Sequence, residues 1–354
     1  MKTGTLSHEA ILGGRNCAIN LAGVRQDENV LIISHGRSDP RIAKAIRLVC
    51  LEAGAKVSEV IVKEEDGTRM VTPSRAILDS MNSSDVIFSN ALMESTEARE
   101  KGARFVGLYM SDVGGLESPG ARLHAEIVFK ICELATEQWK KGKTIRITCS
   151  RGSNLTARIL KESYVFGHVL GPLRPGEFVN FCGGFGGLCL WPGWTGDGVV
   201  YFDVVTTFLD RAEVPLRWTV KDGRVVKVEG QREHVDFINH AIESGGKDAD
   251  HYAEIMIGLC PTARIRMEDM FAGLHFETER HAGVMHNAVG SSTDFYNEDG
   301  APKPPSVRPI IHLDCMRLTP TIKVDDKLSV ENGRLVSLDH PDVRKLARKH
   351  NVEF

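Results

Sequence analysis

The chain of 354 residues contains 44 lysines and arginines against 47 aspartates and glutamates, which gives a formal net charge of −3. With 42% hydrophobic residues it can bury a substantial core, in two domains or in one large domain. Acidic and basic residues are interspersed, which excludes the charge pattern of a nucleic-acid or anionic-membrane binder. A small, nearly neutral molecule is the partner that this composition favours.

The N-terminus and the cysteines indicate the compartment. Residues 1–20 contain no basic segment followed by an apolar run, and nowhere are eighteen consecutive residues apolar. The eight cysteines are scattered and form no Cys-x-x-Cys pair, which is typical of buried thiols in a reducing compartment. We therefore expect a soluble, cytoplasmic protein.

The first part of the chain alternates strands and helices. Val30–Ile33 predicts a strand, residues 34–38 a turn, and Pro40 the first turn of a helix that Gly54 ends. Strands are predicted at 57–62, 85–89 and 105–109, and helical segments at 76–81 and 98–102. This alternation predicts a parallel sheet with helices on both faces, an α/β domain over residues 1–142. His35 and Arg37 follow the first strand, where such sheets bind ligands.

After a long helix predicted over 121–141, the pattern changes. Strands are predicted at 144–149, 198–206, 215–220 and 225–228, with turns at 221–224, 325–327 and 331–334. The second half, residues 143–354, is therefore predicted to be an α+β domain rich in antiparallel strands, and to hold a metal and the catalytic site.

Four segments of that second half place polar residues in apolar or glycine-rich surroundings. His312 and Asp314 are two positions apart in an apolar run, so a strand would point both side chains to one face, where they can share a metal. Glu254 enters an apolar segment, where a carboxylate needs a partner or a cation. Glu177 follows a Pro-Gly turn, and His286 precedes a Gly-Ser-Ser sequence.

Together these segments resemble the metal-ligand blocks of the leucyl aminopeptidase T and S family. The blocks read Gly-Glu-Phe, Glu with Ile-Met-Ile-Gly, His-x-Ala-x-Gly-x-Ser and His-x-Asp, in the family's order. The resemblance implies two divalent metals, zinc, manganese or cobalt, with a shared water as nucleophile. It also implies five ligands, which are Glu177, Glu254, His286, His312 and Asp314. The family's catalytic tyrosine would fall at Thr293, so Tyr296, close by, is the candidate for that role.

A second resemblance covers more of the chain. Ser38-Asp39-Pro40-Arg41, the segment 258–264, and His312-x-Asp314 followed by the segment 324–327 are similar to 2,5-dihydroxypyridine 5,6-dioxygenases. This resemblance implies one Fe(II) held by two histidines and an aspartate. His312 and Asp314 match two of these ligands, whereas Glu254 stands where the other histidine is expected.

The carboxylate-rich ligand set favours a metal-dependent hydrolase, because two histidines and one carboxylate are usual in non-haem iron oxygenases. Its expected substrate is a small amide, lactone or heterocycle. The alternatives are a mononuclear iron ring-cleaving dioxygenase and a non-catalytic scaffold. Either family resemblance implies a homodimer or larger homo-oligomer.

Other polar residues complete the predicted site. The candidate general bases are Glu279, Glu277 and Glu268, which the sequence does not rank. Substrate carboxylates could be bound by nearby cations, and His281 is a further candidate for substrate binding or, like His275, for replacing His286 as ligand. The cations in question are Arg264, Arg280 and Arg317.

Overall fold

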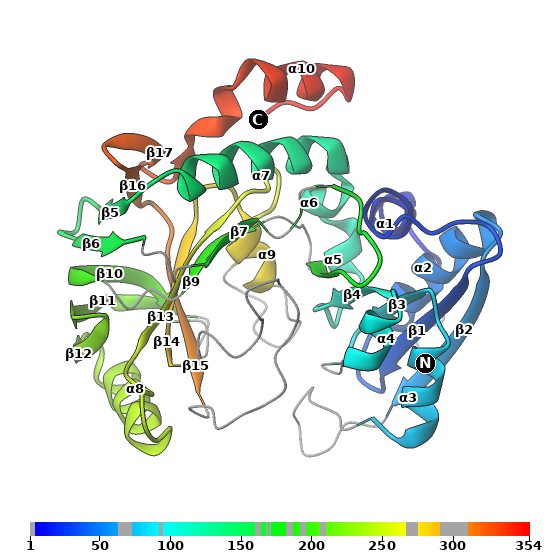
Figure 1. Cartoon of the computed structure of the whole chain (residues 1–354), viewed down its shortest axis with the longest axis horizontal. Helices are drawn as coiled ribbons and strands as arrows, with labels where there is room; N and C mark the ends of the chain where they lie inside the picture. Colours follow the sequence, from blue (N-terminus) through cyan, green and yellow to red (C-terminus); the bar gives the residue numbers. More distant parts are fainter. Residues whose placement is uncertain are drawn as a thin grey trace.

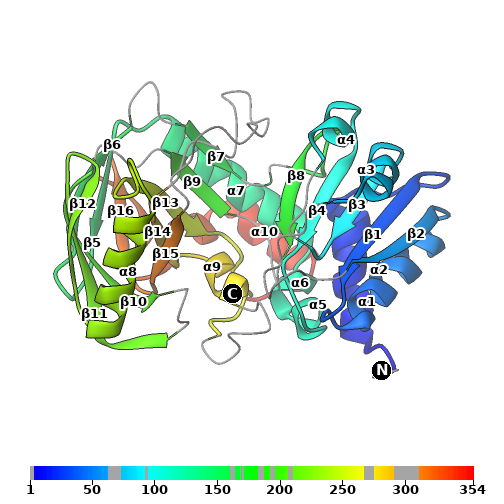
Figure 2. The same ribbon diagram turned by 90° about the horizontal axis from the view of Figure 1, so that it is seen from below.

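The structure is a computed structural model of the chain. It describes residues 4–62, 73–91, 95–159, 164–167, 169, 171–181, 187–191, 196–205, 210–266, 275–290 and 311–354. Two separate sheets lie side by side in it, as Figures 1 and 2 show from two directions.

The first sheet is parallel and has the strand order β2-β1-β3-β4-β8. Its strands are β1 (Asn29–His35), β2 (Lys56–Val62), β3 (Val86–Ser89), β4 (Arg104–Leu108) and β8 (Phe178–Phe181). The prediction of a parallel sheet is confirmed. Strand β8 comes from beyond residue 142, so part of the second half of the chain returns to the first sheet.

Helices accompany this sheet along the chain. They are α1 (His8–Arg15), the π-helix η1 (Asn16–Leu21), α2 (Pro40–Glu52), α3 (Arg75–Asn82), α4 (Thr96–Glu100), α5 (Gly114–Glu117), α6 (Pro119–Arg122) and α7 (Ala125–Lys140). Helix α2 begins where predicted, because the Asp39 side chain accepts a hydrogen bond from the Arg41 amide and Pro40 occupies the first turn. Its apolar side, including Ile42, Ile46 and Val49, is buried in the main core.

The second sheet is antiparallel and curled. Its main path is β18-β17-β16-β5-β6-β10-β15-β14-β13-β9-β7, and β11 and β12 extend it from β10. Its strands are β5 (Thr144–Thr148), β6 (Asn154–Arg158), β7 (Tyr164–Gly167), β9 (Gly187–Trp191), β10 (Asp197–Val205), β11 (Asp210–Lys221), β12 (Arg224–Glu229), β13 (Tyr252–Gly258), β14 (Met285–Gly290), β15 (His312–Arg317), β16 (Thr321–Val324), β17 (Lys327–Glu331) and β18 (Arg334–Leu335). The predicted antiparallel character of this region is confirmed.

Fewer helices belong to the second half: α8 (Arg232–Ser244), α9 (His275–Arg280), the 3-10 helix η3 (Val336–Asp339) and α10 (Pro341–Lys349). Helix α7 links the two halves, because it contacts η1 of the first half and also β7, β9 and α10 of the second half. Figure 1 shows α7 running along one edge of the molecule with α10 outside it.

The tight turns of the second sheet follow from local sequence. Asp222-Gly223, Asp325-Asp326 and Asn332-Gly333 all have positive φ, between 46° and 81°. A two-residue hairpin of type I′ needs positive φ at both central positions, and Asp, Asn and Gly adopt it most readily. These turns join β11 to β12, β16 to β17, and β17 to β18, as the sequence predicts.

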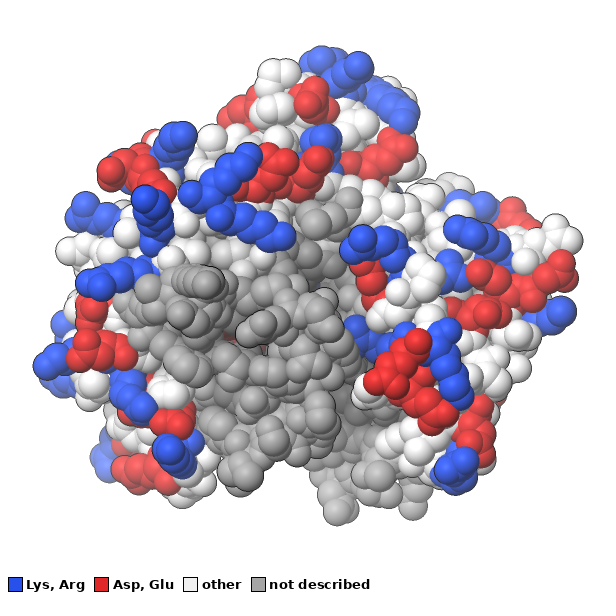
Figure 3. Space-filling model, viewed as in Figure 1, with Lys and Arg blue, Asp and Glu red and all other residues white. Residues whose placement is uncertain are grey.

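The surface agrees with the charge pattern of the sequence. Figure 3 shows lysines and arginines intermixed with aspartates and glutamates on the described part of one face, without a large area of one sign. Among the described residues, no helix has both the length and the apolar character needed to cross a bilayer.

Candidate metal centre

Three neighbouring strands place four of the five predicted ligands on one face of the second sheet. Strand β14 lies between β13 and β15, and Ala288 at its centre pairs with Glu254 on one side and Asp314 on the other. Side chains of directly paired residues point to the same face, so both carboxylates flank a methyl group that leaves space between them. His286 and His312 reach the same place from two residues along their strands.

The side chains of these strands are in contact. His286 Nε2 lies 2.7 Å from Glu254 Oε1, and His312 Nε2 lies 3.2 Å from Asp314 Oδ1. His312 Nε2 is also 3.7 Å from Glu254 Oε1, and His286 Nε2 is 3.9 Å from Asp314 Oδ1. Residues 60 positions apart in sequence thus form one cluster of two imidazoles and two carboxylates, which we call the strand cluster.

Burial and charge together set the protonation of the strand cluster. Burial disfavours a charged His286, but its hydrogen bond to Glu254 and the nearby carboxylates outweigh burial and raise the pKa of His286 to about 9. Burial by itself raises the pKa of Glu254. The hydrogen bonds to His286 and His312 outweigh burial and lower this pKa well below its usual range. For His312 the neighbouring Asp314 overcomes burial and raises the pKa of the imidazole well above its usual range.

Glu279, one of the three predicted candidates for the general base, lies close enough to the strand cluster for the charges there to shift its pKa. The residue is 4% exposed, and its Oε1 has no hydrogen-bond donor among the described residues. Burial is the main cause that raises the pKa of Glu279, and the negative charges of Asp314 and Glu254 raise it further. The charge of His286 acts in the opposite direction, and the resulting pKa of Glu279 is about 7. A carboxyl group with this pKa can take up or release a proton near neutrality.

The donor atoms fit a divalent metal. One ligand atom each from Glu254, His312 and Asp314 lie within 4.8 Å of one another. Two carboxylates and an imidazole suit iron, manganese, zinc or cobalt. His286 is held by Glu254, so it would orient that ligand from behind, as outer hydrogen-bond partners do in metal sites.

Glu177, the fifth predicted ligand, lies elsewhere. It precedes β8 of the first sheet, and its carboxylate accepts hydrogen bonds from the Arg174 backbone amide and from Arg174 Nε, both at 2.7 Å. The structure does not bring Glu177 into the strand cluster. A Pro-Gly turn before a carboxylate is a local pattern, and the register of β8 with β4 decides where that turn is placed.

The predicted substrate-binding arginines have protein partners. Arg264 bonds to Glu277 through its backbone amide at 2.7 Å and its Nε at 3.2 Å, and Glu277 is fully buried. Arg317 donates to Asp203 Oδ1 at 2.7 Å. Arg280 is buried, and its Nη1 lies 3.7 Å from the sulfur of Met256. These contacts favour a structural role for Arg264, and the charge of Arg280 acts on the nearby carboxyl group of Glu279.

The remaining candidates divide into two groups. His281 Nδ1 lies 2.6 Å from the Ala263 carbonyl oxygen, which fixes the ring in a loop and not in the strand cluster. The residues whose side chains lie outside the described part of the chain are Tyr296, Glu268 and His275. For these three, the predicted roles stay predictions.

Asn287, which the sequence analysis does not single out, stabilises the strands that carry the candidate site. Asn287 is fully buried and donates hydrogen bonds to Tyr252 Oη at 2.5 Å and to the Glu254 carbonyl oxygen at 3.2 Å. It thereby ties β14 to β13 on the face opposite His286. A polar residue next to His286 in an apolar strand was the available signal.

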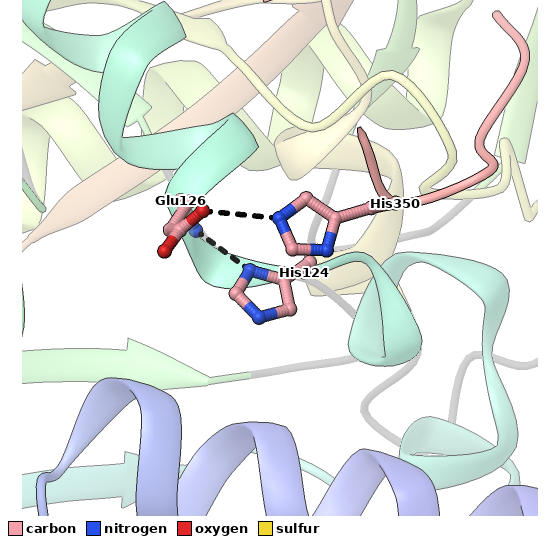
Figure 4. Close-up of side chains that lie close together, drawn as sticks. All are labelled: His124, Glu126 and His350. Atoms are coloured by element: carbon pink, nitrogen blue, oxygen red, sulfur yellow. Dashed lines mark hydrogen bonds and ion pairs between the residues drawn. The ribbon is translucent and has the colours of Figure 1, made fainter. Parts of the chain in front are cut away.

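A second cluster of histidines and a carboxylate lies at the surface, and Figure 4 shows its arrangement. His124 caps α7, because its Nδ1 accepts a hydrogen bond from the Glu126 backbone amide at 3.3 Å. His350 Nε2 lies 3.0 Å from Glu126 Oε2. The two imidazole rings are stacked, with centroids 3.7 Å apart and an interplanar angle of 16°. We call these residues the helix cluster, because they join the end of α10 to the start of α7.

Comparison with known proteins identifies the family of the chain. The sequence model of the family described as NicX, 2,5-dihydroxypyridine 5,6-dioxygenase, matches residues 15–337. The chain belongs to this dioxygenase family. No curated protein sequence matches the chain.

Solved structures share the fold. The 2,5-dihydroxypyridine dioxygenase from Pseudomonas putida KT2440 has a TM-score of 0.76 and 18% identity, covering 95% of this chain and 99% of that one. Wild-type AmpT from Thermus thermophilus has a TM-score of 0.57 and 10% identity, covering 93% of this chain and 99% of that one. Both predicted resemblances are confirmed, and the dioxygenase is the more similar of these two structures.

Proposed function

We propose that the chain is a mononuclear non-haem iron dioxygenase that opens a hydroxylated aromatic or pyridine ring. The observation that carries the proposal is the dioxygenase family's match over residues 15–337, which includes every residue of the strand cluster. The predicted main function, a dinuclear hydrolase, is less well supported. It needs Glu177 as a ligand, and that carboxylate is bound to Arg174.

The proposed iron ligands are Glu254, His312 and Asp314. The iron would supply the redox chemistry that lets molecular oxygen react with the ring. Other residues of the protein position these ligands and transfer protons in this proposal. His286 holds the carboxylate of Glu254 in place, and Asn287 holds the backbone of β13 beneath it.

Glu279 has the proton-transfer role. A hydroxylated ring is more reactive once a ring hydroxyl has lost its proton, and a base with a pKa near 7 can accept that proton at neutral pH. Its burial excludes bulk water from the carboxyl group, and Arg280 beside it favours the ionised form that results when the proton leaves again.

Oxygen consumption tests the proposal. Protein purified without oxygen is loaded with Fe(II), and oxygen uptake is measured with dihydroxypyridines and dihydroxybenzoates. We expect one oxygen molecule consumed per ring opened, with loss of the ring's ultraviolet absorbance. Asp314→Asn should abolish uptake, and Asp342→Asn, a surface residue at the start of α10, serves as the matched control.

A metal-dependent hydrolase remains the second candidate because of one observation. Two of the three atoms offered to the metal are carboxylate oxygens, a set that also suits zinc, manganese or cobalt. Turnover of small amides or lactones without oxygen, supported by those metals and not by iron, would establish this candidate and overturn the dioxygenase.

A further inference from the structure

A polar cavity is associated with the far end of β15. It has a volume of about 390 Å³ and is lined by Ser150, Arg151, Asp203, Ala212, Arg317, Leu318 and Thr319. Asp314 and Arg317 are three positions apart on this strand, so their side chains point to opposite faces of the sheet. The cavity is therefore distinct from the proposed iron site, although one strand contributes to both.

Arg317 forms the buried wall of this cavity. It is 2% exposed, and it donates to Asp203 Oδ1 at 2.7 Å and to Thr319 Oγ1 at 3.0 Å. Its Nε is buried and has no hydrogen-bond acceptor among the described residues. A buried guanidinium with an unused donor is costly, so an anion placed against this group would stabilise its charge.

The charges of the residues that line the cavity also favour a bound anion. Asp203 Oδ2 also accepts a hydrogen bond from the Leu318 backbone amide at 3.0 Å, so both carboxylate oxygens of Asp203 already have donors within the protein. Arg151 lies 3.5 Å from Asp203 Oδ1, and its side chain is 53% exposed. Two guanidinium groups against one carboxylate leave one positive charge, and the hydroxyls of Ser150 and Thr319 add polar groups to the lining.

We propose that this cavity binds a small carboxylate, with the guanidinium groups of Arg317 and Arg151 donating to its two oxygens. A single negative charge matches the net charge of the lining, and a planar carboxylate matches guanidinium geometry. The volume lies within the usual range of small-molecule sites, about 300–1,000 Å³. The site does not depend on the proposed iron chemistry.

Binding is tested on metal-free protein, so that a carboxylate has no iron to bind. Sodium acetate and inorganic phosphate are titrated at constant ionic strength, with sodium chloride as the reference, and the melting temperature and heat of binding are recorded. We expect saturable one-to-one binding of acetate. Arg151→Gln should weaken this binding at least tenfold, and it should not unfold the chain because Arg151 is mostly exposed.

Two further variants complete the test. Thr319→Val removes the hydroxyl beside Arg317 and should weaken acetate binding several-fold. Arg232→Gln removes an arginine that is 94% exposed on α8, so it should leave binding unchanged. Equal binding in Arg151→Gln and Arg232→Gln, no saturable binding of acetate, or tighter binding of phosphate than of acetate would each overturn the proposal.

Discussion

The strand cluster and the helix cluster use the same residue types in different surroundings. In each cluster three ligand atoms lie within 4.8 Å of one another, those of Glu254, His312 and Asp314 in one and those of His124, Glu126 and His350 in the other. In the strand cluster the side chains of Glu254 and His286 are 5% exposed, whereas the Glu126 side chain of the helix cluster is 45% exposed. Burial makes the interactions of the strand cluster stronger, because less water screens the charges.

The directions of the pKa shifts follow from this contrast. His286 and His312 have raised pKa values because carboxylates outweigh the effect of burial. For His124 in the helix cluster, burial and then the stacked His350 lower the pKa. Stacked, nearly parallel rings also direct their nitrogen lone pairs in parallel planes, which does not favour convergence on one ion. Proximity of ligand-type residues is therefore not sufficient for a metal site, and the direction of the side chains decides.

Replacing one residue in each cluster gives the largest expected difference. Asp314→Asn should reduce bound metal and turnover at least a hundredfold, because it removes a proposed ligand. Glu126→Gln should leave both unchanged. Metal content is measured by mass spectrometry on protein prepared without oxygen, and equal metal loss in the two variants would contradict the distinction between the clusters.

Glu254→His sharpens the comparison by changing the ligand type within the strand cluster. The substitution would create two histidines and one carboxylate, the set usual for non-haem iron oxygenases. We expect the ratio of iron to zinc bound from an equal mixture to increase several-fold. A Glu254→Gln variant controls for loss of charge, and a ratio that falls in Glu254→His would argue against Glu254 as a ligand.

Glu279→Gln separates proton transfer from metal binding. Turnover should fall about 10²–10⁴-fold, the usual contribution of a general base, while metal content stays within twofold of the original protein. Burial and nearby carboxylates raise the pKa of Glu279 to about 7 in the metal-free protein, so the base is half ionised near that pH. A bound cation favours the ionised form, so the activity of the original protein should rise with pH at or below 7, and the variant should lack this limb of the profile.

The helix cluster gives the smallest expected effect. Hydrogen bonds from Lys349 and His350 lower the pKa of Glu126 to about 2, so its contribution to stability is present above the unfolded pKa and is lost as pH falls towards 2. At pH 6, Glu126→Gln should reduce the free energy of unfolding by about 0.2–1 kcal/mol, as expected for an exposed ion pair. The difference should shrink below pH 4.5.

Urea unfolding at both pH values measures this effect. Glu9→Gln is the matched control, since Glu9 is also an acidic residue in the first turn of a helix. A larger loss for Glu9→Gln than for Glu126→Gln would contradict the assignment of the helix cluster as a contact that holds α10 on α7.

Much of the fold was readable from local sequence. The strand of Val30–Ile33, the capped start of α2 and the three tight turns depend on residues close together in the chain. Helices α1, α8 and α10 were not predicted, because weakly apolar segments become helices through their packing. The placement of β8 was also beyond prediction, since pairing with β4 joins residues about 70 positions apart.

The candidate site divides in the same way. The sequence by itself determined which residues are candidates for the chemistry, because carboxylates and imidazoles in apolar strands stand out. His312 and Asp314 needed only strand alternation to share a face. Only the tertiary structure decided which of them meet. The register across β14 sets Glu254 and Asp314 on either side of Ala288, and it leaves Glu177 with Arg174 on another sheet. Such pairings are long-range hydrogen-bond patterns, and no residue type encodes them alone.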